Sequence, residues 1–218
     1  MKRIFIFPTI EEAKAFILTE PRDPVFVGGV GMAEIAAATL RAVKAKKPQL
    51  VVLAGIAGAC DRTLRRGEVV EVVCERIAGI PERYAREYET SGPDLGLPLA
   101  AGVTVNRSGD GAAATGGPKS AAEGTGHAAG DAGFAEPHPG TQRQTPEGNP
   151  ENTSEGYLPE VENMEGAAFF AVCDALGVAC CQIRAVSNYV GEPFGQWAVE
   201  EAVGNLTEKL NQIFENNE

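Results

Sequence analysis

The sequence lacks long hydrophobic runs, an excess of positive charge, and any Cys or His spacing typical of a metal site. No apolar run reaches the length of about 18 residues that a membrane-spanning helix needs, and the run after Lys2 and Arg3 is too short for a signal peptide. The formal net charge of −11 disfavours nucleic acids and membranes as partners, because both select basic surfaces. The five cysteines form no CxxC pair, so we expect reduced thiols, a cytoplasmic location and no metal or other cofactor.

A segment rich in Gly, Ala, Pro, Ser and Thr occupies residues 107–156. Phe134 is its only large apolar residue, so the segment buries too little surface to offset the entropy of ordering it. We therefore predict a single domain over residues 1–218 that carries a disordered insert at 107–156. The two histidines, His127 and His138, both lie in this insert, which argues against a histidine-based catalytic triad or metal site.

Apolar stretches and helix-like stretches alternate along the rest of the chain. β-branched and aromatic runs predict strands at residues 3–7, 24–31, 49–59, 67–78, 96–107 and 178–188. Helical periodicity and end signals predict helices at residues 8–18, 32–47, 166–177 and 197–215. Because the strands are apolar on both faces, this order is typical of a largely parallel sheet with helices on both sides.

Polar residues and glycines gather where the predicted strands end. In an open α/β sheet, ligands bind at the carboxyl ends of the strands. In chain order these positions hold Glu12, Gly28, Gly29 and Gly31, Ile56 and Gly58, Asn106, and Ser187 and Asn188. The partial glycine loop GGVG lacks the GxGxxG spacing of a dinucleotide site, so that interpretation has little support.

Each candidate residue also has a purely structural interpretation. Thr9 and Glu12 have the spacing of a capping box. An acid at Glu165 favours the N-terminus of the helix that follows it. Asn188 is a common type of turn residue, and AGIAGA at residues 54–59 is consistent with close helix–strand packing. Their shared location at one edge of the predicted sheet is what favours a binding site.

Six segments together resemble the nucleoside phosphorylase/nucleosidase superfamily: PTIEE, GVGMAEIAAAT, AGIAGACDRTLRRGEVVEV, GVTVN, ENMEGAAFF and IRAVSN. The resemblance covers residues 1–106 and residues 157 to about 210. It implies a three-layer α/β/α sandwich around a mixed, twisted and partly barrel-like sheet. It also implies a homodimer or larger homo-oligomer.

The resemblance also implies roles for three residues. In the superfamily, the glutamate matching Glu165 accepts hydrogen bonds from the ribose hydroxyls, which suits an ionised carboxylate because it only accepts. The methionine matching Met164 packs on the apolar face of the sugar. The glutamate matching Glu12 lies near the anomeric carbon and activates water. Two carboxylates there would stabilise the oxocarbenium-like state of N-glycoside cleavage.

Asn188 indicates which purine base the expected nucleoside carries. Adenosine-type nucleosidases in the superfamily have Asp at this position. An amide donates to purine N7 and to a 6-oxo oxygen without an unusual protonation state, so Asn188 favours hypoxanthine over adenine. By the same match, Ser187 and Arg184 orient the Asn188 loop, and Thr104 and Val105 lie along the purine.

The loop FPTIEE indicates whether phosphate or water is the nucleophile. The superfamily's phosphorylases bind phosphate after the first strand with a Gly-Asp-Pro-x-Arg type loop, whereas this loop has two acids and no arginine. Carboxylates repel a phosphate dianion, so we expect water as the nucleophile and hydrolysis of a purine nucleoside. The alternatives are a 5′-methylthioadenosine/S-adenosylhomocysteine nucleosidase, an inosine phosphorylase and a non-catalytic purine-nucleoside binding protein. The presence of Glu12 argues against the last.

Overall fold

The structure is a computed structural model that describes residues 1–109 and 158–215, all within one structural unit. The predicted insert, apart from residues 107–109, and both histidines therefore lie outside the described residues. The described elements, in chain order, are β1 (Arg3–Phe7), α1 (Ile10–Ile17), β2 (Val25–Val27), α2 (Met32–Lys46), β3 (Leu50–Ala59), β4 (Val69–Ile77), η1 (Glu82–Tyr84), β5 (Glu87–Glu89), β6 (Leu99–Thr104), β7 (Glu160–Asn163), α4 (Gly166–Leu176), β8 (Ala179–Tyr189), η2 (Phe194–Gln196) and α5 (Val199–Phe214).

The described strands form one mixed sheet in which seven follow the order β2-β1-β3-β7-β6-β4-β5. The eighth, β8, pairs parallel with β3 and antiparallel with β4. As a result, β3, β8, β4, β6 and β7 close into a small barrel, and β2–β1 and β5 extend from it. The expected α/β fold with a mixed central sheet is confirmed. The expectation of a largely parallel sheet holds for the pairs β1–β2, β1–β3 and β3–β8. It is wrong for β4, which runs antiparallel to β5 and β8, and for β7, which runs antiparallel to β3.

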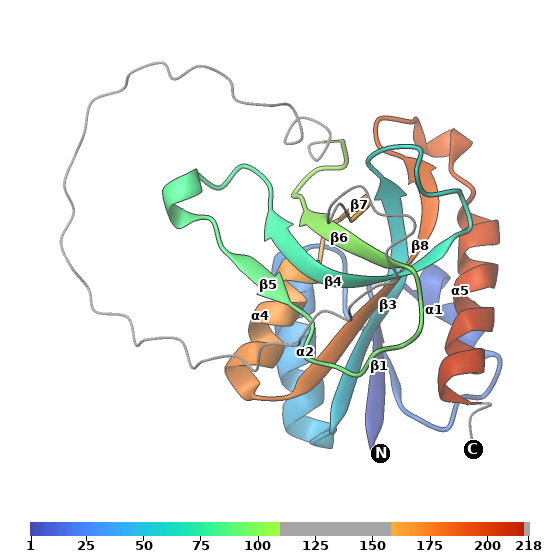
Figure 1. Ribbon diagram of the computed structural model, residues 1–218. Coiled ribbons are helices and arrows are strands. Elements are labelled where there is room, and N and C mark those ends of the chain that lie inside the picture. The colour runs from blue at the N-terminus through green and yellow to red at the C-terminus, as the bar shows by residue number, and fades with distance from the viewer. Residues whose placement is uncertain (110–157, 216–218) are drawn as a thin grey trace, which may run out of the picture. The chain divides into compact units, whose positions relative to one another are not determined.

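Helices cover both faces of the sheet, with α1 and α5 on one side and α2 and α4 on the other (Figure 1). The alternation of side chains along β1 explains why its sequence is apolar throughout. Phe5 and Phe7 pack in the core cluster that includes Phe16 of α1, whereas Ile4 and Ile6 pack in the opposite cluster with residues of α2 and α4. The three-layer architecture is therefore confirmed.

Local signals place the helix ends as expected. Thr9 is the N-cap of α1, and its Oγ1 accepts from the backbone N–H of Glu12 at 3.2 Å. Gly177 ends α4 with a φ of 61°, a left-handed conformation that glycine adopts without steric cost. Leu206, Leu210 and Phe214 recur at helical spacing and form the buried stripe of α5.

Two short strands escape the sequence analysis. β5 and β7 consist of three and four residues, and both carry glutamates rather than an apolar run. β7 nevertheless pairs with β3 and β6, which buries Val161 and Asn163. The VENMEG segment is therefore a strand that turns into helix α4, and this turn positions Glu165.

The described helices include none that is both long and apolar enough to cross a bilayer. All five cysteines lie in the described part of the chain, and all are free thiols. Cys173, Cys180 and Cys181 are buried, and burial raises the pKa of the Cys181 thiol well above its ordinary value.

Candidate active site

A cavity of about 160 Å³ lies at the carboxyl ends of the parallel strands β1, β3 and β8. This is the edge at which ligands bind in open α/β sheets. Of the ten residues predicted for the site, these eight line the cavity: Glu12, Ile56, Gly58, Met164, Glu165, Arg184, Ser187 and Asn188. The sequence therefore brings together side chains from β1–α1, β3, β7–α4 and β8.

Thr104 and Val105 are outside the set of residues that line the cavity. Thr104 is fully buried at the end of β6, where its hydroxyl donates to Glu75 Oε2 at 2.8 Å. The backbone N–H of Val105 donates to the carbonyl oxygen of Asn163 at 2.8 Å. Both residues support the β7–α4 turn, whereas the resemblance implied contact with a purine.

Glu12 extends from the first turn of α1 into the cavity and is 7% exposed. Its Oε1 accepts from the Thr9 hydroxyl at 2.8 Å, and its Oε2 accepts from the backbone N–H of Ile56 on β3 at 2.8 Å. Burial raises the pKa of this carboxyl, and the Ile56 hydrogen bond and the charge of Arg184 partly oppose that shift. The Thr9–Glu12 pair thus caps the helix and also aims a carboxylate with raised basicity at the cavity.

Gly55 permits this close approach between β3 and Glu12. A Cβ atom at position 55 would lie 2.5 Å from Glu12 Oε2 and 2.7 Å from Arg184 Nη1. Real Cβ atoms do not approach other atoms so closely, so the small-residue run in β3 has a function beyond helix–strand packing. The same geometry places the Glu12 carboxylate and the Arg184 guanidinium on one side of β3.

Glu165 occupies the N-cap position of α4, but its side chain makes no capping hydrogen bond. Its Oε1 instead accepts from the backbone N–H of Gly31 at the start of α2, at 3.0 Å. Its Oε2 accepts from Arg184 Nη2 at 3.1 Å and from the Met164 N–H at 3.3 Å. The carboxylate is therefore held at the cavity by Gly31 and Arg184 from two other segments and by the N–H of the preceding residue, and it makes no capping bond to α4.

Arg184 is the fully buried cation of the cavity wall. It pairs with Glu165 and also donates to the carbonyl oxygen of Ile56 and to Asn163 Oδ1, both at 3.2 Å. Its charge lowers the pKa values of Glu12 and Glu75 against the dominant effect of burial. One guanidinium thus compensates several carboxylates in a water-poor environment.

Asn188 is 2% exposed at the end of β8, and its amide has a fixed orientation. The Ser187 hydroxyl donates to Asn188 Oδ1 at 2.7 Å, so the amide nitrogen is the group left to act as a donor. Nδ2 uses one hydrogen on the carbonyl oxygen of Tyr189 at 3.1 Å. The second hydrogen of Nδ2 is available to a ligand acceptor.

Several residues of the site were missed from the sequence. Pro8, Val30, Glu162, Asn163 and Trp197 also line the cavity. Asn163 had a recognisable signal, since it lies inside the VENMEG segment. Val30 and Trp197 had none, because an apolar residue near the end of a predicted strand or helix does not indicate which cavity it lines.

Within residues 1–109 and 158–215, no group of three or more His, Cys, Asp or Glu side chains has the arrangement of a metal site. The cavity chemistry available in these residues is therefore that of carboxylates, one guanidinium and two amides. Such a set can bind hydroxyl groups, activate water and donate to a heterocyclic base.

Comparisons with known proteins find a matching family model and similar solved structures. Residues 150–216 match the model of the Phosphorylase superfamily. The structure resembles a Helicobacter pylori 5′-methylthioadenosine/S-adenosylhomocysteine nucleosidase solved with butyl-thio-DADMe-Immucillin-A, with a TM-score of 0.67, 16% identity and coverage of 98% of this chain and 97% of that chain. It equally resembles futalosine hydrolase of H. pylori strain 26695, with a TM-score of 0.67, 15% identity and coverage of 97% of each chain.

A third similar structure is the corresponding nucleosidase from Neisseria meningitidis in complex with methylthio-immucillin-A, with a TM-score of 0.66, 15% identity and coverage of 98% of each chain. No curated protein matches the sequence. At these identities the likeness establishes the fold, which this chain shares with these solved structures.

Proposed function

We propose that this protein is a nucleosidase that hydrolyses the N-glycosidic bond of a 6-oxopurine nucleoside, and that its substrate is futalosine, the hypoxanthine nucleoside of menaquinone biosynthesis. The observation that carries the proposal is the convergence of Glu12 and Glu165 on one cavity. They come from α1 and from the β7–α4 turn, and Arg184 contacts the Glu165 carboxylate and the Ile56 carbonyl between them. Two carboxylates with different partners suit two different roles.

In the proposed reaction, Glu165 accepts hydrogen bonds from the ribose hydroxyls and Met164 packs on the sugar. Water attacks the anomeric carbon while Glu12 accepts its proton. The new C–O bond forms as the C–N bond to the base breaks, and the bonding electron pair goes to the purine. The departing base takes a proton from solvent at a ring nitrogen other than N7, and the proton on Glu12 returns to solvent. Asn188 Nδ2 stabilises the developing charge on the base by donating to N7.

Water is the proposed nucleophile because the cavity repels anions. Among the described residues that line it, Glu12, Glu162 and Glu165 are acids, and Arg184 is the single base. Nη1 of Arg184 already donates to Ile56, and Nη2 already donates to Asn163 and Glu165. A phosphate dianion would therefore meet carboxylates without a free cation, which argues against an inosine phosphorylase.

The test is a chromatographic assay of the purified protein with futalosine, inosine and 5′-methylthioadenosine, each with and without phosphate. We expect hypoxanthine from futalosine at a rate independent of phosphate. Release of adenine from methylthioadenosine would instead place the protein with the nucleosidases of that substrate. Phosphate-dependent release from inosine would indicate a phosphorylase, and binding without release would indicate a purine-nucleoside binding protein.

Asn188→Asp is expected to weaken turnover of hypoxanthine nucleosides about 10- to 100-fold relative to adenine nucleosides. An ionised aspartate cannot donate to N7 or to a 6-oxo oxygen, and losing a charged or buried hydrogen bond has roughly this effect. Competition kinetics between inosine and adenosine measure the ratio. Asn211→Asp on the outer helix α5 introduces the same charge away from the cavity and is the control. Unchanged preference in Asn188→Asp would contradict this assignment of base recognition.

Assembly as a homodimer or larger homo-oligomer and a cytoplasmic location belong to the same proposal. Both stay predictions from the sequence. Size-exclusion chromatography with light scattering on the full chain measures the first.

A further inference from the structure

Glu75 on β4 is a fully buried carboxylate that does not itself line the cavity. It is surrounded by hydrogen-bond donors. Thr104 Oγ1 donates to its Oε2 at 2.8 Å, Gln182 Nε2 donates to its Oε1 at 2.9 Å, and Asn163 Nδ2 also donates to Oε1. An ionised carboxylate only accepts, so this environment matches the charged form of the group.

Two of these donors hold the first turn of α4. The backbone N–H groups of Glu165 and Gly166 donate to Asn163 Oδ1 at 3.0 and 2.7 Å. The N–H of Ala167 donates to Thr104 Oγ1 at 2.9 Å. The first N–H groups of a helix have no partner within the helix, so these side chains satisfy them. The carboxylate on β4 thus orients the acceptors for three consecutive N–H groups.

The same amide links Glu75 to the cavity. Because Asn163 Nδ2 is bound to Glu75, its Oδ1 faces Arg184, whose Nη2 donates to it at 3.2 Å. Arg184 Nη2 also donates to Glu165 Oε2 at 3.1 Å. A continuous set of contacts therefore runs from Glu75 through Asn163 and Arg184 to the carboxylate proposed to bind the ribose.

The Glu75 side chain has no room for another position. A Cβ atom on Gly102 of β6, or on Gly166 of α4, would overlap its carboxylate. Because both positions are glycine, the Glu75 carboxylate fits closely between β6 and α4. The group is therefore packed as well as hydrogen-bonded, which is the arrangement expected for a residue that orients others.

We propose that Glu75 is a positioning residue for the nucleoside site, which through Asn163 and the first turn of α4 holds the Glu165 carboxylate where the ribose hydroxyls bind. This inference rests on the proposed function for the identity of the ligand. It assigns to a residue outside the cavity a specific effect on binding, distinct from a general contribution to stability.

The ionisation of Glu75 gives this role a signature. Burial raises the pKa of Glu75 to about 7, although the hydrogen bonds from Thr104, Asn163 and Gln182 and the charge of Arg184 act in the opposite direction. Of the groups that face it, Thr104, Asn163 and Gln182 are neutral, and Arg184 on β8 carries the charge. Protonation of Glu75 would leave the three donors with one carboxylate oxygen fewer to bind. The ordered arrangement of these side chains therefore requires the ionised form of Glu75.

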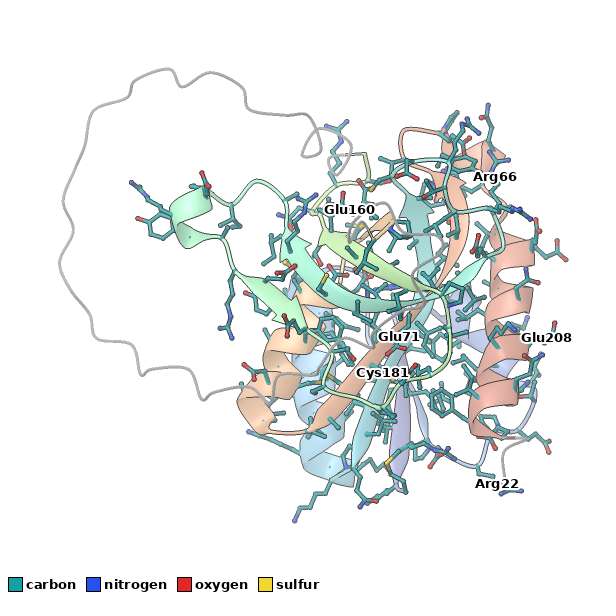
Figure 2. All side chains as sticks on the ribbon, viewed as in Figure 1. Arg22, Arg66, Glu71, Glu160, Cys181 and Glu208 are labelled. Carbon is teal, nitrogen blue, oxygen red and sulfur yellow. The ribbon has the colours of Figure 1, made fainter. Side chains whose placement is uncertain are left out.

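Glu71 is a matched control on the same strand. The pairing of β4 with β6 shifts between Val72 and Cys74, so Glu71 pairs with Leu99 whereas Glu75 pairs with Gly102. Positions 99 and 102 lie on opposite faces of β6, and the two glutamates therefore face opposite sides of the sheet. Figure 2 shows Glu71 beside Cys181. Glu71 is also fully buried and accepts from the Leu95 N–H at 3.3 Å, away from the network of Glu75.

The experiment compares Glu75→Gln with Glu71→Gln by the fluorescence of Trp197. This residue is the single tryptophan of the chain and lines the cavity, so its emission reports binding directly. Inosine is titrated into both variants in a Glu12→Gln background, which prevents consumption of the ligand and removes one titrating group. We expect Glu75→Gln to raise the Kd for inosine about 10- to 100-fold and Glu71→Gln to change it less than about threefold.

The pH dependence provides the second measurement, and it does not depend on whether Glu75→Gln folds. In the Glu12→Gln protein, inosine binding is expected to tighten as the pH rises through about 7, the pKa of Glu75. In the folded double variant this rise is expected to disappear. Equal Kd values for the two variants, or a flat pH profile in the Glu12→Gln protein, would overturn the positioning role. If the positioning role fails but the wild type hydrolyses nucleosides, the proposed function stands. If Glu75→Gln selectively loses inosine binding but the wild type shows no turnover, the positioning role stands and the proposed function fails.

Discussion

Replacing Glu12 with glutamine is expected to lower kcat for nucleoside hydrolysis by a factor of about 10²–10⁴ and to leave the Kd for inosine within about threefold. The amide has the shape of the carboxyl and can still accept from the Ile56 N–H, which holds the present side chain at 2.8 Å. It cannot take a proton from water. The loss therefore falls on the chemical step. Discontinuous turnover assays measure kcat, and Trp197 fluorescence titrations measure the Kd for inosine.

Glu11→Gln is the control for this substitution. Glu11 is the preceding residue of α1 and is exposed, so its neutralisation changes net charge and helix propensity in the same way without touching the cavity. A kcat for Glu12→Gln equal to that of Glu11→Gln would show that Glu12 is not the base. The proton of the attacking water would then be accepted by another group.

The pH profile provides an independent check on the same residue. Burial raises the pKa of Glu12 above its ordinary value of 4.5. A general base acts in its ionised form, so kcat is expected to fall as the pH drops through this raised pKa. The acid limb of the wild-type profile should therefore lie at higher pH than an ordinary glutamate would give. It should be absent from the residual activity of Glu12→Gln.

The sequence contains enough information to place most of the cavity because the relevant signals are local. Thr9 and Glu12 have capping-box spacing, which fixes the start of α1 directly after a buried strand. Ser187 and Asn188 end an apolar run, so they fall at the carboxyl edge of a parallel strand. Once strands run in parallel, the residues after them meet at one edge of the sheet.

The rest depends on pairings that no local pattern encodes. Glu71 and Glu75 are four residues apart, which in a regular strand puts both side chains on one face. The irregularity between Val72 and Cys74 turns them to opposite faces, and only the pairing partner β6 reveals it. β7 is similar, because a four-residue strand with two glutamates becomes buried only through contacts with β3 and β6.

Replacing Arg184 with methionine is expected to reduce the free energy of unfolding by about 3–5 kcal/mol at pH 7. Methionine fills much of the space but provides no charge. The Glu165 carboxylate, 4% exposed, would lose its ion pair at 3.1 Å, and Glu12 and Glu75 would lose the cation that lowers their pKa values. Buried carboxylates without a counter-charge are costly to ionise. Urea denaturation of the variant and the wild type measures the difference.

Arg66→Met is the matched control, because Arg66 also forms an ion pair, with Glu192 at 2.6 Å, but its side chain is 37% exposed. Figure 2 shows Arg66 at the periphery of the described residues. Solvent screens such a surface pair, so its loss is expected to change stability far less than the loss of the buried pair. A loss in Arg184→Met as small as that in Arg66→Met would contradict the view that one guanidinium compensates the carboxylates of the cavity.

The pH dependence of the same variant tests the cause of its instability. Without Arg184, the folded-state pKa values of Glu12 and Glu75 rise further above their unfolded values, so the folded state binds protons more tightly than the unfolded chain does. Folding is then favoured by acid, and the deficit relative to the wild type is expected to shrink as the pH falls from 7 toward 5. Adding Glu165→Gln should restore part of the stability at pH 7, because it removes one uncompensated charge. A stability deficit that is constant with pH and unaffected by Glu165→Gln would indicate lost packing at position 184. Side-chain packing, and not charge compensation by Arg184, would then stabilise the cavity.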